Sequence, residues 1–127
     1  MAQILVIDDD NEVRGLLCTL LRRAGHIVTE AEDGQKGIHS YRTGKADLII
    51  TDLFMPVKEG LETIVDLRKE FPDLKIIAIS GGSREGDGNY LKAAKLCGAS
   101  RIFSKPFDNT ELLAAVAELL GPAENKK

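Results

Sequence analysis

The sequence predicts a doubly wound α/β fold, in which helices cover both faces of a five-stranded parallel sheet. Five short apolar runs alternate with five stretches whose apolar residues recur at helical spacing. Such alternation forms a parallel sheet, because right-handed crossovers place helices on both of its faces. The length of 127 residues fits a single core. We expect one domain over residues 1–122 with a short flexible tail at 123–127 and no output domain.

The first half of the chain contains three expected strands and two expected helices. Residues 3–8 form an apolar, β-branched run that ends in acid, as in a strand buried on both faces. Residues 11–23 have apolar side chains at helical spacing and end in two arginines before a glycine. A strand is expected at 27–31, a short helix stopped by glycine at 34–42, and a strand ending in aspartate at 48–52.

The second half continues the same alternation. Residues 61–71 have a helical pattern that a proline stops, and residues 75–80 form the next apolar run. A helix is expected at 90–96 and a strand at 101–104. The last helix follows an aspartate N-cap and extends over 108–120, where glycine and proline end it.

Composition excludes several classes of protein. The 17 basic and 20 acidic residues give a net charge of −3 and are mixed along the chain, so nothing favours binding to nucleic acid or anionic lipid. No signal peptide precedes the first apolar run, and no apolar stretch approaches the roughly 20 residues of a membrane span. We expect a cytoplasmic protein without direct nucleic-acid or membrane partners. Cys18 and Cys97 are expected to be small buried side chains without chemistry.

Acidic residues gather at the ends of two expected strands. Asp8 and Asp9 end the first strand and Asp52 ends the third, and ligands of doubly wound sheets bind at this edge. Crowded carboxylates repel one another unless a cation shares them, and Mg²⁺ prefers oxygen ligands of this kind. The backbone carbonyl of Phe54 would add another oxygen, and Lys105 a positive charge for a phosphate oxygen. Asp52 is therefore a candidate nucleophile toward phosphorus.

Four blocks of residues at these strand ends carry a family resemblance. The blocks are Val6-Ile7-Asp8-Asp9, Thr51-Asp52-Leu53-Phe54-Met55-Pro56 followed by Gly60 and Leu61, Ile79-Ser80, and Ser104-Lys105-Pro106-Phe107. Over residues 3–120 the chain resembles response-regulator receiver domains of two-component systems, of the single-domain kind found among chemotaxis and sporulation regulators. The resemblance implies the strand order 2-1-3-4-5 of the flavodoxin-like (βα)5 fold.

The resemblance also implies a signalling role and partners. Asp52 would accept a phosphoryl group from a histidine kinase or histidine phosphotransfer protein, with Asp8 and Asp9 as further Mg²⁺ ligands. Ser80 and Lys105 would contact the phosphoryl group and transmit a change of conformation to a downstream protein effector. Such a domain is no turnover enzyme, although it assists its own phosphorylation and dephosphorylation. The implied partner surface includes Lys92, Lys95, Arg101 and Ile102.

Three alternatives remain at this point. A phosphatase with an aspartyl nucleophile needs a second acid two residues later, where Phe54 stands. A flavin-binding protein of the same fold needs a phosphate loop after the first strand, where this chain has acids. A degenerate receiver would only bind proteins, but all five site residues are present. Asp10, one residue beyond the acid pair, is expected to be solvated or to cap the next helix.

Overall fold

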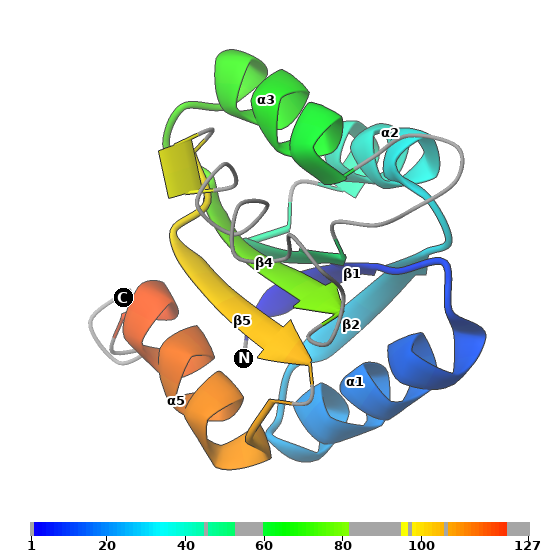
Figure 1. The fold of residues 1–127 in the computed structure, drawn as a ribbon, viewed down its shortest axis with the longest axis vertical. Helices are drawn as coiled ribbons and strands as arrows, with labels where there is room; N and C mark the ends of the chain where they lie inside the picture. The colour runs from blue at the N-terminus through cyan, green and yellow to red at the C-terminus, as the bar shows by residue number, and fades with distance from the viewer. Residues whose placement is uncertain are drawn as a thin grey trace.

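The fold is a five-stranded parallel sheet between two layers of helices (Figure 1). The computed structural model describes residues 2–44, 46–52, 60–81, 95–96, 98–105 and 107–121. Its strands are β1 (Gln3–Ile7), β2 (Ile27–Ala31), β3 (Leu48–Asp52), β4 (Lys75–Gly81) and β5 (Arg101–Lys105). They pair in the order β2-β1-β3-β4-β5, which confirms the expected fold class and strand order.

Helices of the described part of the chain lie in pairs on the two faces of the sheet. They are α1 (Asn11–Arg23), α2 (Gly34–Gly44), α3 (Gly60–Glu70) and α5 (Asn109–Leu120). Figure 1 shows α1 and α5 on one face and α2 and α3 on the other. The helix expected at 90–96 lies outside the described residues except for Lys95 and Leu96, which are helical.

Element boundaries differ from the expected ones by one or two residues. The first strand ends at Ile7, so Asp8 stands just beyond it. The fourth and fifth strands each extend one residue further, because Gly81 pairs with Lys105. The second helix continues to Gly44 instead of stopping at residue 42.

Side chains of the central strands enter two separate cores. Ile4 and Val6 of β1 belong to the cluster that includes Leu17 of α1 and Leu112 of α5. The alternate residues of the same strand, including Ile7, belong to the cluster with side chains of α2 and α3. The continuous apolar runs therefore reflect burial on both faces of the sheet, as parallel strands require.

Gly37 of α2 lies so close to β1 that a side chain at this position would collide with Ile7. A Cβ atom at Gly37 would lie 2.3 Å from Cδ1 and 2.7 Å from Cγ1 of Ile7. Ile7 is fully buried and directly precedes Asp8, so it has little room to move. The absence of a side chain at Gly37 thus sets the distance between α2 and the strand that leads to the acid pair.

We expect Gly37→Ala to lower the free energy of unfolding by up to about 2 kcal/mol in urea denaturation followed by circular dichroism. Overpacking a core costs about 1–3 kcal/mol, and the helix propensity of alanine offsets about 1 kcal/mol of it. Gly15→Ala is the matched control, because Gly15 lies within α1 with no atom within 4 Å of its Cβ position. That control should gain about 0.5–1 kcal/mol. Equal gains at both sites would contradict the tight contact.

Candidate functional site

Three carboxylates converge at the carboxyl edge of β1 and β3. Asp8, Asp9 and Asp52 each offer one oxygen, and these oxygens all lie within 4.8 Å of one another. The parallel register explains this, because Ile7 pairs with Thr51 and the next residue of each chain segment is an acid. Asp8 and Asp52 are only 1% and 5% exposed, whereas Asp9 reaches solvent. The cluster therefore combines two buried carboxylates with one that is exposed to solvent.

In the turn after β1, hydrogen bonds hold Asp8 and Asp10 in different ways. The amide of Asp8 donates to the carbonyl of Ala31 at 3.1 Å, which continues the pairing of β1 with β2. The amide of Asp10 donates to Oδ1 of Asp8 at 2.9 Å. Oδ1 of Asp10 in turn accepts from the amides of Glu12 at 2.9 Å and Val13 at 3.2 Å, so Asp10 is the N-cap of α1. Asp10 is also exposed, so the two expectations for it, contact with solvent and capping of the helix, are both confirmed.

The donor set fits a hard divalent cation. All three groups are carboxylates, which Mg²⁺ and similar ions prefer over nitrogen or sulfur ligands. Octahedral ligands about 2.1 Å from Mg²⁺ lie about 3–4 Å from one another, close to the spread of these oxygens. The acidic cluster is compatible with the metal site predicted from the sequence.

Comparison with known proteins decides the family. A family model for the response regulator receiver domain matches residues 4–117. The chain belongs to the response regulator receiver domain family. The resemblance found in the sequence blocks is therefore confirmed.

Relatives of this receiver domain include longer regulators. It is 40% identical over 115 residues to the KDP operon transcriptional regulatory protein KdpE of Escherichia coli, covering 90% of this chain and 49% of KdpE. It is 37% identical over 121 residues to the DNA-binding transcriptional regulator NtrC of Azospirillum brasilense, covering 94% of this chain and 24% of NtrC. The chain thus spans about half of KdpE and about a quarter of NtrC.

A solved structure with the same fold is the response regulator protein TrrA of Thermotoga maritima, in complex with Mg(2+)-BeF. Its TM-score is 0.83 and its sequence identity 32%, over 94% of this chain and 99% of that chain.

Two further predicted site residues, Ser80 and Lys105, lie in the neighbouring strands β4 and β5. Asp52 pairs with Ile79 of β4, so Ser80 follows one residue beyond the level of Asp52. Ser80 in turn pairs with Ser104, and Lys105 is the last residue of β5. The backbone therefore brings both residues to the same edge of the sheet as Asp52. Phe54, whose carbonyl is the remaining predicted ligand, lies outside the described residues.

Residues of the predicted partner surface have varied surroundings. Lys95 is exposed and donates to the carbonyl of Ser100 at 3.3 Å. Arg101 forms an ion pair with Glu118 of α5, and Ile102 is partly buried against the core on the α2 and α3 side. Lys92 lies outside the described residues. The partner surface remains a prediction.

Cys18 has the structural role expected from the sequence. Cys18 lies on the buried face of α1, is 1% exposed and packs in the core between this helix and the sheet. Burial, with the nearby carboxylate of Glu30 as a second cause, raises the pKa of its thiol to about 11. The thiol therefore stays protonated at neutral pH, which makes it a poor nucleophile. Cys97 lies outside the described residues.

Arg14 is a residue near the site that the sequence patterns did not single out. Its Nη1 donates to the backbone carbonyl of Asp8 at 2.6 Å. In the sequence it is one of three polar residues in the first turn of α1, and only its spacing from the acid pair was available as a signal.

The membrane prediction has a counterpart in the structure. Among the residues that are described, no helix combines the length and the apolar character that crossing a membrane requires.

We expect Asp10→Ala to lower the free energy of unfolding by about 1 kcal/mol, because the substitution removes the N-cap of α1. Asp10→Ser is the matched control. Both variants lose the charge of Asp10, but serine retains an oxygen that accepts from the helix amides. Urea denaturation of both variants separates the cap from the charge. Equal stability of the alanine and serine variants would contradict the capping role.

Proposed function

We propose that this receiver domain accepts a phosphoryl group on Asp52 from a phosphohistidine donor and thereby controls the binding of a protein partner. The observation that carries the proposal is the convergence of Asp8, Asp9 and Asp52 within 4.8 Å. A nucleophilic carboxylate next to two further acids needs a cation before a phosphate dianion can approach. The site therefore suits phosphoryl transfer better than the binding of an unassisted anion.

The proposed metal is Mg²⁺, held by Asp8, Asp9, Asp52 and the backbone carbonyl of Phe54. When bound, the ion supplies positive charge beside the phosphoryl oxygens. The complex of TrrA with Mg(2+)-BeF supports this choice, because beryllofluoride is a stand-in for a phosphoryl group on a carboxylate. The fit of Mg²⁺ to this chain rests on the three carboxylate oxygens of Asp8, Asp9 and Asp52.

The chemical step is a displacement at phosphorus. An oxygen of Asp52 forms the new bond to phosphorus while the bond to the donor's histidine nitrogen breaks, and that nitrogen keeps the electron pair. Lys105 would place its ammonium group on a phosphoryl oxygen, and Ser80 would donate its hydroxyl hydrogen to another. The product is an acyl phosphate that the domain itself helps to form and to hydrolyse, so the protein acts as a signalling switch.

The partners follow from the chemistry and from the relatives. The donor is a histidine kinase or a histidine phosphotransfer protein. KdpE and NtrC are transcriptional regulators, which supports a regulatory output for this receiver. We propose that phosphorylation shifts an equilibrium between two conformations, so that an effector binds one of them more tightly. The surface of Lys92, Lys95, Arg101 and Ile102 is the proposed contact region.

Incubation with Mg²⁺ and acetyl phosphate should add one phosphoryl group to the wild-type chain, measured as intact mass. We expect no adduct with Asp52→Ala and none when a chelator removes Mg²⁺, because nucleophile or counter-charge is then missing. Asp10→Ser is the matched control, since it changes a neighbouring acid that caps α1, and should form the adduct. An adduct of equal yield on Asp52→Ala, or none on the wild type, would refute the proposal.

A further inference from the structure

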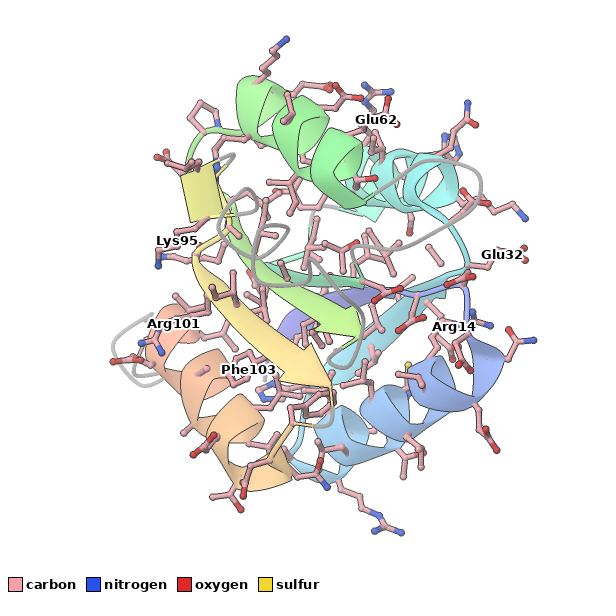
Figure 2. The ribbon with its side chains drawn as sticks, in the orientation of Figure 1. Arg14, Glu32, Glu62, Lys95, Arg101 and Phe103 are labelled. Atoms are coloured by element: carbon pink, nitrogen blue, oxygen red, sulfur yellow. The ribbon has the colours of Figure 1, made fainter. Side chains whose placement is uncertain are left out.

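We propose that Arg14 of α1 is a positioning residue that fixes the turn bearing Asp8 and Asp9 for cation binding. The inference rests on the proposed function and deepens it, because it names a residue outside the acidic cluster on which the geometry of the cluster depends. Figure 2 shows Arg14 beside the segment that leads from β1 to α1.

The guanidinium of Arg14 connects three parts of the chain. Nη1 donates to the carbonyl of Asp8 at 2.6 Å, Nε to Oε1 of Glu30 at 3.1 Å, and Nη2 to Oδ1 of Asn11 at 2.5 Å. The side chain is only 15% exposed. A planar group held at three edges has little freedom, so the bond to Asp8 is well defined in direction.

The bond to Asp8 completes the restraints on its backbone. The amide of Asp8 is held by Ala31 of β2, and its Oδ1 accepts from the amide of Asp10. The carbonyl that Arg14 holds belongs to the peptide joining Asp8 to Asp9. Arg14 therefore fixes the orientation of the peptide from which Asp9, the exposed acid of the cluster, projects.

A positioning role and a purely electrostatic role for Arg14 predict opposite changes in Mg²⁺ affinity when Arg14 is replaced. A cation near a metal site repels the metal, so loss of the Arg14 charge would strengthen Mg²⁺ binding. Glu30 reduces this repulsion by pairing with the guanidinium. A positioning role predicts weaker binding when Arg14 is replaced, because the oxygens of Asp8 and Asp9 lose their alignment. The sign of the change therefore separates the two roles.

Arg22 provides a matched control on the same helix. Its Nη2 lies 3.6 Å from Oε2 of Glu30 and donates to the carbonyl of Val28 at 3.1 Å. Arg22 thus shares the helix, the charge and the Glu30 partner of Arg14. Within the described part of the chain, the contacts of its side chain are with β2 and not with the turn of Asp8. Arg22→Gln therefore removes a charge, the Glu30 pair and the bond to Val28, but no bond to that turn.

The test is the Kd for Mg²⁺, measured by calorimetry or amide NMR titration in wild type, Arg14→Gln, Arg14→Lys and Arg22→Gln. We expect Arg14→Gln to raise the Kd about tenfold or more, as for other residues that orient metal ligands. Arg14→Lys retains the charge but not the planar fork, so its Kd should lie between those of wild type and Arg14→Gln. Arg22→Gln should stay close to wild type.

A second readout requires no metal. The amide of Asp10 reports on the carboxylate of Asp8 through its hydrogen bond, so its chemical shift should change in metal-free Arg14→Gln but not in Arg22→Gln. This measurement separates a displaced turn from a general loss of stability, which both arginine variants would share.

Each outcome decides the inference. A Kd for Arg14→Gln that equals that of Arg22→Gln, or is tighter than wild type, overturns it. If Arg14→Gln does not fold, Arg14→Lys decides, since a Kd no weaker than that of Arg22→Gln also overturns it. Absence of Mg²⁺ binding and of the phosphoryl adduct in the wild type would instead refute the proposed function, and the inference with it.

Discussion

Parallel pairing of β1 with β3 is the constraint on which the acidic site depends. The register aligns Ile7 with Thr51 and so brings the acids that follow them to one edge of the sheet. At an effective dielectric constant of about 20, two unit charges about 5 Å apart repel by about 3 kcal/mol. Asp8 and Asp52 are both buried, so solvent screens their repulsion poorly. The apolar cores on both faces of the sheet hold the strands together against this repulsion.

The same repulsion gives the site its proposed chemical use. Crowded carboxylates favour a cation, and in the proposed mechanism a cation next to Asp52 would favour a phosphate group. The proposed order of events, in which the metal binds before the phosphoryl group arrives, follows from this repulsion. The turn of Asp8 and Asp9 has to keep its shape while these charges change, and the hydrogen bonds of Arg14, Ala31 and Asp10 restrain it.

Much of the fold and of the site could be predicted from the sequence, for reasons that can be named. Strands buried on both faces read as continuous apolar runs, and the acids ending two of them pointed to one edge of the sheet. The strand order came from the family resemblance and not from the residues. That Asp10 caps α1 while it remains exposed could be seen only in the structure, because three consecutive aspartates are compatible with either role.

Arg14 was not predictable for a different physical reason. Its role depends on a side chain that reaches from the helix to a backbone carbonyl six residues earlier, and carbonyls have no signature in a sequence. Ile7 and Gly37 illustrate the same limit, since their contact arises only when α2 packs on the sheet. Contacts between elements were therefore harder to foresee than the elements themselves.

The most direct test of the account is to locate the metal in the folded chain. Mn²⁺ takes the same oxygen ligands as Mg²⁺ and broadens the amide resonances around it. With Mn²⁺ below stoichiometric amounts, the account predicts that the amides of Asp8, Asp9, Asp10 and Asp52 lose intensity first. The amides of Asp47 and Asp73, which precede β3 and β4 at the opposite edge of the sheet, should keep theirs. Broadening centred on Asp47 or Asp73, or spread evenly over the acidic residues, would contradict it.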